Sequence, residues 1–216
     1  TLADTADDIA DALQRAIREQ GLPEPSREKV VASIGSGARQ LIERCADRNQ
    51  EAVLAGFLER YGSHLLDRTR LYPGVAETLA KIEAVKVVLS NKPTAMCRRM
   101  VEGLGIAPHF SAVYGGDAFP ERKPDPAVVR RVRERFPGRA LLVGDSGTDV
   151  ETARAAGIPV VAVTYGYHRP GELKAADHRI DSICDLMDLL GLPPFGWGGG
   201  GYENGADPRR REEGKQ

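Results

Sequence analysis

The most informative segment of this chain reads Leu141-Leu142-Val143-Gly144-Asp145-Ser146-Gly147-Thr148-Asp149. Its apolar half predicts a buried strand, and Gly144 allows the backbone to turn tightly where that strand ends. Asp145 follows at once, and Asp149 comes four residues later at the start of a predicted helix. Two carboxylates at the carboxyl end of a strand are the oxygen ligands that Mg²⁺ prefers. The segment predicts a metal site; the alternative is that Asp149 only caps the helix and Asp145 is a turn residue.

Outward from this segment, short apolar runs alternate with helical patterns. Strands are predicted at residues 87–89, 112–114, 140–143 and 159–163, and helices at residues 94–104, 126–136 and 148–156. Strands that alternate with helices indicate a parallel sheet covered on both faces. The predicted fold class is therefore α/β, with a Rossmann-like parallel sheet core.

The first third of the chain has only helical periodicity. Apolar residues recur at spacings of three and four over about residues 2–20, after the predicted Ser26 cap, and again over residues 41–45 and 53–65. Gly35 and Gly37 interrupt this pattern. A small helical unit is therefore expected before the sheet. After Gly191 the periodicity is lost, and residues 192–216 are expected to form a disordered, Gly-rich polar tail.

The composition excludes several classes of protein. The 216 residues include 30 Lys and Arg against 31 Asp and Glu, a formal net charge of -1, which provides no positive field for nucleic acid. No run approaches the roughly 18 apolar residues of a membrane span. The three cysteines form no CxxC pair, which favours a reducing compartment and buried thiols. We expect a cytoplasmic protein that binds neither nucleic acid nor a membrane.

Polar residues also follow two other predicted strands. Ser90-Asn91 comes directly after residues 87–89, and Lys123-Pro124-Asp125-Pro126 precedes the helix predicted from residue 126. Ser and Asn commonly begin turns, and a lysine in a Pro-rich turn is often solvated, so each motif alone is weak. Ligands in such sheets bind beyond the carboxyl ends of the strands, where these residues are expected to converge with Asp145.

In this order, Ser90-Asn91, the Lys123 segment and Gly144-Asp145-Ser146 with Asp149 resemble motifs two, three and four of the haloacid dehalogenase-like hydrolases. The resemblance implies a sheet core into which a small helical cap is inserted. It divides the chain into a remnant of the first core motif (1–4), a cap (5–71), a core (72–191) and the tail (192–216).

The resemblance also implies roles for these residues in a Mg²⁺-dependent phosphatase. Ser90 would hydrogen-bond a phosphoryl oxygen beside Asn91, and Lys123 would neutralise negative charge. Asp145 would bind Mg²⁺, with Asp149 supporting it as the second metal-site residue. A cation and a lysine suit this chemistry because a phosphate dianion is otherwise repelled by carboxylates.

Further segments, among them Tyr72-Pro73-Gly74-Val75 and Val163-Thr164-Tyr165-Gly166-Tyr167, resemble family members that act on 2-phosphoglycolate. The expected partner is thus a small phosphorylated metabolite, and the chain is expected to be a monomer or a homodimer. The alternatives are another phosphomonoester, pyrophosphate, a phosphosugar mutase reaction, or a binding module that lacks a nucleophile.

The glycine-rich break in the helical third is the expected substrate loop. Gly37, Ala38 and Arg39 are its candidate substrate-binding residues, and either Arg39 or Arg44 could bind a substrate carboxylate. The alternative is a plain turn between helices.

The family's first motif, D-x-D-G-T, places a nucleophilic Asp four positions before its threonine, and Thr1 matches that threonine. The resemblance therefore implies that the nucleophile, the acid/base Asp and the central strand that carries them lie upstream of Thr1. Asp4 follows this motif and is no substitute for it.

The 216-residue chain is therefore predicted to be inactive on 2-phosphoglycolate with Mg²⁺. Phosphate-monoester hydrolysis needs up to ~10²¹-fold acceleration, which the chain is not expected to reach without its nucleophile. The control is a version lengthened before Thr1 by a strand that ends in Asp-x-Asp-Gly. Robust phosphate release by the shorter chain would contradict the prediction.

Overall fold

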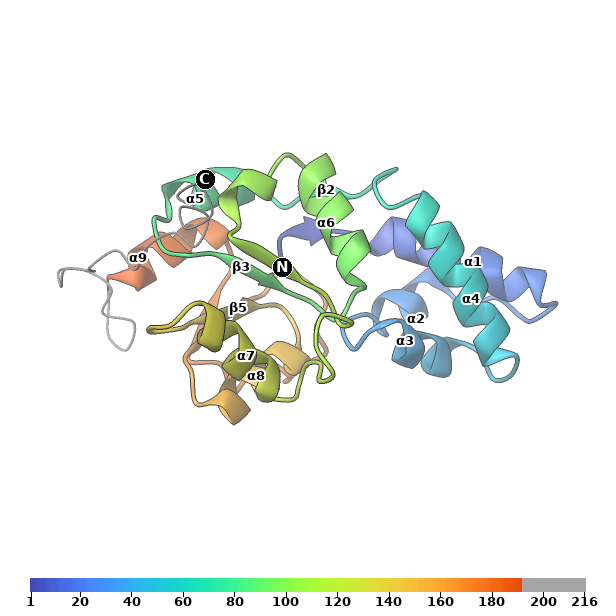
Figure 1. Cartoon of the computed structure of the whole chain (residues 1–216). Coiled ribbons are helices and arrows are strands. Elements are labelled where there is room, and N and C mark those ends of the chain that lie inside the picture. Colours follow the sequence, from blue (N-terminus) through green and yellow to red (C-terminus); the bar gives the residue numbers. More distant parts are fainter. Residues whose placement is uncertain (192–216) are drawn as a thin grey trace, which may run out of the picture.

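The computed structural model describes residues 1–191, so the expected tail at 192–216 lies outside the described residues. A helical part and an α/β part lie side by side (Figure 1). They are joined by a two-stranded antiparallel ribbon of β1 (Ala3–Asp4) and β2 (Arg70–Leu71). None of the helices in the described part has the length and apolar character needed to cross a bilayer.

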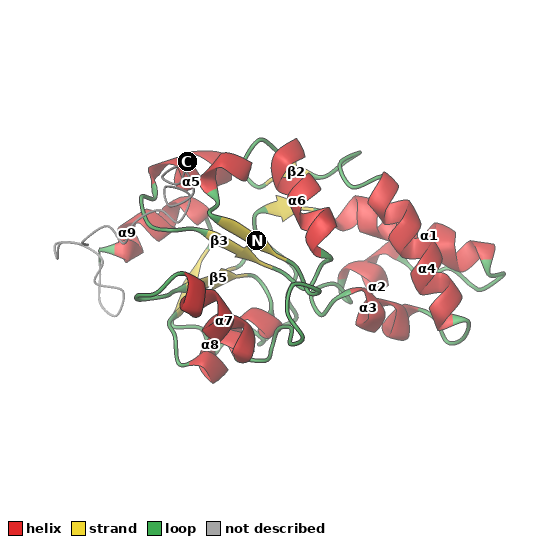
Figure 2. Ribbon diagram, viewed as in Figure 1, coloured by secondary structure: helices red, strands yellow, loops and turns green. Residues whose placement is uncertain are grey.

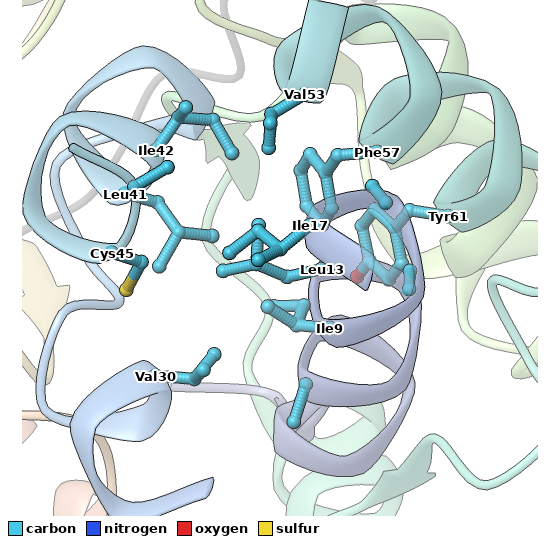
Figure 3. Close-up of a cluster of buried hydrophobic side chains, with 14 of the residues drawn as sticks. Ile9, Leu13, Ile17, Val30, Leu41, Ile42, Cys45, Val53, Phe57 and Tyr61 are labelled. Atoms are coloured by element: carbon cyan, nitrogen blue, oxygen red, sulfur yellow. The ribbon is translucent and has the colours of Figure 1, made fainter. Parts of the chain in front are cut away.

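The helical part surrounds one apolar cluster. It contains α1 (Ala6–Glu19), α2 (Arg27–Val31), α3 (Ala38–Cys45) and α4 (Gln50–Ser63). Ile9, Leu13 and Ile17 repeat along one face of α1 and meet Phe57 and Tyr61 of α4 (Figure 3). The periodicity seen in the sequence is thus the buried stripe of each helix.

The α/β part follows the order predicted from the alternating pattern. Its elements are α5 (Val75–Lys81), β3 (Val87–Leu89), α6 (Thr94–Gly103), β4 (Ala112–Tyr114), α7 (Ala127–Arg135), β5 (Leu142–Gly144), α8 (Gly147–Ala156), β6 (Val160–Val163), β7 (His178–Ile180) and α9 (Leu186–Leu190). β3 pairs with β4, and β5, β6 and β7 form a second sheet; all three pairings are parallel. The predicted α/β class with parallel strands is confirmed.

Successive residues of β6 serve opposite faces of the sheet. Val160 and Ala162 pack with α7 and α8, whereas Val161 and Val163 pack with α5 and α9. Figure 2 shows α7 and α8 on one side of the strands and α5 and α6 on the other. Because both faces are covered, β6 is apolar throughout and fully buried.

The two parallel sheets belong to one layer. Val88 of β3 and Val143 of β5 pack against the α5 side, and Leu89 and Leu142 of the same strands pack against the α8 side. Within residues 1–191 no ladder joins β3 to β5, and these apolar side chains are only half-buried. Both strands therefore retain an unpaired edge inside the layer.

The sequence did not predict β7 or the ribbon of β1 and β2. The expectation that the cysteine thiols are buried was wrong for one of the three. Cys45 and Cys97 are buried, but Cys184 is exposed.

A buried carboxylate fastens α1 to the ribbon. Asp8 is 3% exposed and accepts hydrogen bonds from the backbone N–H of Arg68 (3.0 Å) and from Thr69, through its N–H at 2.8 Å and its hydroxyl at 2.7 Å. Asp11, one turn later on α1, pairs with the Arg68 guanidinium at the exposed surface. Asp8 therefore helps set where the helical part leaves the ribbon.

Replacing Asp8 by Ala should lower the free energy of unfolding by about 2–4 kcal/mol, because buried donors lose their acceptor. Asp11→Ala is the matched control and should cost less than about 1 kcal/mol, as exposed ion pairs do. Urea unfolding followed by circular dichroism measures both values. Equal losses would show that burial of Asp8 is not what matters.

Candidate active site

The polar residues singled out in the sequence lie in loops at one edge of the layer. Ser90 and Asn91 follow β3, Lys123 lies in the loop after β4, and Asp145 follows β5. Parallel strands end at a common edge, so these loops meet there. Residues 35–37 of the helical part approach the same edge, because Gly35 lies beside Ser146 and Gly37 beside Asn91.

Asp149 uses both of its carboxylate oxygens within the site. Oδ1 accepts from Lys123 Nζ at 2.7 Å. Oδ2 accepts from the N–H of Asp145 at 3.2 Å and from Ser146, through its N–H at 3.1 Å and its hydroxyl at 2.7 Å. Asp149 thus caps α8 and holds Lys123 at the same time. In this arrangement it acts on the site through Lys123 and the Asp145 backbone, and its predicted role at a metal stays a prediction.

Asp145 is a buried carboxylate whose two oxygens are both held by hydrogen-bond donors. The Thr1 nitrogen lies 2.9 Å from its Oδ1, the Thr1 hydroxyl also donates to it, and the Tyr167 N–H donates to Oδ2 at 2.7 Å. Asp145 is therefore fixed between Thr1 and the loop after β6.

Two glycines allow the backbone to approach these carboxylates. A Cβ on Gly144 would lie 2.3 Å from the Cβ of Asp149, and a Cβ on Gly166 would lie 2.1 Å from Oδ2 of Asp145. Neither position has space for a side chain. Gly144, the last residue of β5, is thus explained by close packing as well as by the turn.

The loop of Ser90 and Asn91 contacts the Lys123 segment through Asn91. The Ser90 hydroxyl oxygen accepts from the Lys92 N–H at 3.1 Å, and Asn91 Nδ2 donates to the Lys123 carbonyl at 3.0 Å. Oδ1 of Asn91 is buried and has no hydrogen-bond partner among the described residues. Asn91 therefore joins two loops of the site and retains one unused acceptor.

The expected substrate loop divides between two environments. Gly37 reaches Asn91, Ala38 begins α3 and packs against the helical cluster, and Arg39 turns outward. Arg39 is paired with Glu51 at 2.5 Å, and its side chain is 52% exposed. Arg44 instead lines a cleft that it shares with Ser146. Of the two arginines considered for a substrate carboxylate, the structure places Arg44 at the site and Arg39 away from it.

The sequence did not reveal the role of Tyr167. Its N–H holds Asp145, while its hydroxyl accepts from the Thr5 N–H at 2.8 Å and donates to Asp4. One residue thus joins the Asp145 carboxylate to the start of α1. The sequence signals were the position of Tyr167 after the strand predicted at residues 159–163 and the resemblance of residues 163–167 to family members, and neither gives its contacts.

Comparison with known proteins agrees with this geometry. The family model described as haloacid dehalogenase-like hydrolase matches residues 1–163, which is most of the chain. The chain belongs to the haloacid dehalogenase-like hydrolases. The resemblance seen in the motifs is therefore confirmed, and the chain is an enzyme of the phosphoric monoester hydrolase type.

Several relatives in this hydrolase family are named phosphoglycolate phosphatase. Phosphoglycolate phosphatase of Rhodospirillum rubrum is 36% identical and covers 98% of this chain and 94% of its own length. The Chromobacterium violaceum phosphoglycolate phosphatase is 34% identical and covers 88% of this chain and 92% of its own. A crystal structure of a predicted phosphoglycolate phosphatase from Haemophilus somnus superposes with a TM-score of 0.82 at 30% identity, and covers 88% of this chain and 93% of its own.

Asp149→Asn should lower the free energy of unfolding by about 3 kcal/mol, because the Lys123 ammonium is left buried without its carboxylate. The double variant Lys123→Met/Asp149→Asn should be more stable than Asp149→Asn alone by about 1 kcal/mol or more, since it removes the unpaired charge as well. Denaturant titration of both variants and of Lys123→Met completes the cycle. Purely additive losses would mean that the pair is not coupled.

Proposed function

We propose that this protein is a Mg²⁺-dependent phosphatase that hydrolyses 2-phosphoglycolate to glycolate and phosphate. The observation that carries the proposal is the gathering of the Ser90-Asn91 loop, Lys123 and the buried Asp145 carboxylate at one edge of the parallel layer. The substrate is supported by relatives named phosphoglycolate phosphatase that match along most of the chain. A reducing, cytoplasmic setting is proposed with it from the cysteine pattern.

The donors present suit Mg²⁺. This ion binds through one or two carboxylates and completes its shell with water and phosphate. Asp145 offers one buried carboxylate at the edge of the layer. Among residues 1–191 no three His, Cys, Asp or Glu side chains gather as a ready-made metal site. Asp145 would hold the ion, and Asp149 would support it by fixing the turn that carries Asp145. When bound, Mg²⁺ would neutralise phosphoryl charge.

The chain's own side chains perform the remaining work. Lys123 is fixed by Asp149 and has its ammonium directed into the site, where it would offset negative charge that develops on the phosphoryl oxygens. The Ser90 hydroxyl, whose oxygen accepts from the Lys92 N–H, retains its proton to donate to a phosphoryl oxygen. Both groups would bind the transferring phosphoryl group more tightly as its charge increases.

The proposed pathway proceeds through an aspartyl-phosphate. Asp145 is held by Thr1 and Tyr167. Asp149 is held by Lys123 and Ser146, and the proposal assigns the nucleophile to neither aspartate. The proposal gives this role to an aspartate on a strand between β3 and β5, whose edges are unpaired within the described residues. A phosphate-binding module without this nucleophile is the alternative, and it too is compatible with the engaged carboxylates.

A panel of phosphate compounds tests the proposal with the chain lengthened before Thr1 by the Asp-x-Asp-Gly strand. Phosphate release from 2-phosphoglycolate should exceed that from other phosphomonoesters and pyrophosphate by at least about tenfold in kcat/KM, and EDTA should abolish it.

Lys123→Met should lose about 10²–10³-fold in kcat, the cost of removing a group that stabilises transition-state charge. Asp145→Asn should require far more Mg²⁺ for activity.

The matched control is Lys86→Met, because Lys86 directly precedes β3 and lies at the end of that strand remote from Ser90. It should leave turnover unchanged. Binding of phosphate without turnover of any ester would reject the phosphatase and favour the binding module.

A further inference from the structure

A cleft of about 340 Å³ separates the helical part from the α/β part beside Asp145. Gly35 and Ser36 line it from the helical part, and Ser146 and Gly166 line it from the α/β part. Ser146 follows Asp145 directly, and Gly166 lies against the Asp145 carboxylate. The cleft is therefore continuous with the site in which the phosphoryl group would bind, and its volume suits a small organic acid.

Two arginines reach this cleft from opposite sides. Arg44 comes from α3 and donates to the Ser33 carbonyl at 3.2 Å and to Ser36 Oγ at 3.5 Å. Arg169 comes from the loop after β6 and donates to the Ala32 carbonyl at 3.4 Å. Both guanidinium groups therefore converge on the single turn formed by residues 32–36.

Neither guanidinium group has a carboxylate partner in the part of the chain that the structure describes. Their acceptors are uncharged oxygens. Arg44 also donates to one further uncharged oxygen, Gln40 Oε1, at 3.4 Å. Arg27 also lines the cleft, but it is paired with Asp7. Arg169 is exposed and Arg44 is half-buried, so both guanidinium groups are accessible to an anionic ligand in the cleft.

The acidic residues of the cleft are directed to other donors. Glu172 accepts from the Arg169 backbone N–H at 2.9 Å. Glu28 lies in the first turn of α2, where hydrogen bonds from its own N–H and from Ser26 lower its pKa. In the described part of the chain the guanidinium groups of Arg44 and Arg169 bond to neutral oxygens, and neither forms an ion pair with these two carboxylates.

We propose that Arg44 and Arg169 together bind the carboxylate of the substrate, and that they select a phosphorylated acid over an uncharged phosphate ester. This rests on the proposed function and adds the residues that recognise the organic half of the substrate. Exchange of neutral acceptors for a carboxylate is favourable, because a carboxylate adds opposite charge and can accept two parallel hydrogen bonds from a guanidinium group. Arg169 belongs to the α/β part and Arg44 to the helical part, so the carboxylate would join the two.

Calorimetric binding to the 216-residue chain with Mg²⁺ tests the proposal. The two ligands are 2-phosphoglycolate and ethyl phosphate, which has the same two-carbon chain but a methyl group in place of the carboxylate. Arg44→Gln and Arg169→Gln should each weaken 2-phosphoglycolate binding by about 10–100-fold, the range for a charged hydrogen bond, and change ethyl phosphate binding less than about twofold. Arg39→Gln is the matched control and should change neither.

The proposal would be overturned if the two variants bound both ligands equally more weakly, or if they bound neither more weakly. It would also be overturned if Arg39→Gln showed the same loss, or if the unaltered chain did not prefer 2-phosphoglycolate. Unchanged binding of ethyl phosphate shows that each variant still folds. Kinetics of the lengthened chain separate this proposal from the proposed function. If the lengthened chain turns over no ester, the phosphatase is rejected. If it turns over both esters, and Arg44→Gln and Arg169→Gln leave the ratio of their kcat/KM values unchanged, only the carboxylate site is rejected.

Discussion

One carboxylate, that of Asp149, connects the polar loops of this protein. Lys123, from the loop after β4, bonds to one of its oxygens, and the backbone after β5 bonds to the other. The same group therefore orients a buried ammonium, caps α8 and fixes the turn that carries Asp145. Because β4 and β5 belong to separate hydrogen-bonded sheets, this contact also joins loops that no strand pairing connects within the described residues. The positions of the Lys123 ammonium and the Asp145 carboxylate therefore both depend on Asp149.

The helical part is coupled to this site through α6. Met96 and Met100 of α6 pack against the cluster of the helical part, and Arg99 donates to the Gly62 carbonyl at 2.6 Å. Lys92, just before α6, lies 4.4 Å from the centre of the Tyr61 ring. Since Ser90 and Asn91 lead directly into this helix, the loop proposed to bind the phosphoryl group and the helical part share one packed unit.

Most of the fold was predictable because its strands are short and apolar on both faces. Residues 87–89 and 112–114 are strands with the predicted bounds. β7 was missed since His178-Arg179-Ile180 has one apolar residue, and only its pairing with β6 makes it a strand. Within the site, Ser90, Lys123 and Asp145 stood out because each follows a strand. Tyr167 and Arg169 did not, because their roles depend on contacts with the helical part, Thr5 and Ala32, more than 100 positions away.

The sequence alone determined the alternation of elements, the family and the residues that gather at the strand ends, since these depend on local periodicity and on motif order. It left Arg39 and Arg44 equivalent, and it left Asp149 either a cap or a metal-site residue. Only the tertiary structure distinguished the arginines, because Glu51 neutralises Arg39 at the surface while Arg44 faces the cleft. It likewise showed that Asp149 caps α8 and binds Lys123 at once, because a carboxylate has two oxygens and the fold brings donors to both.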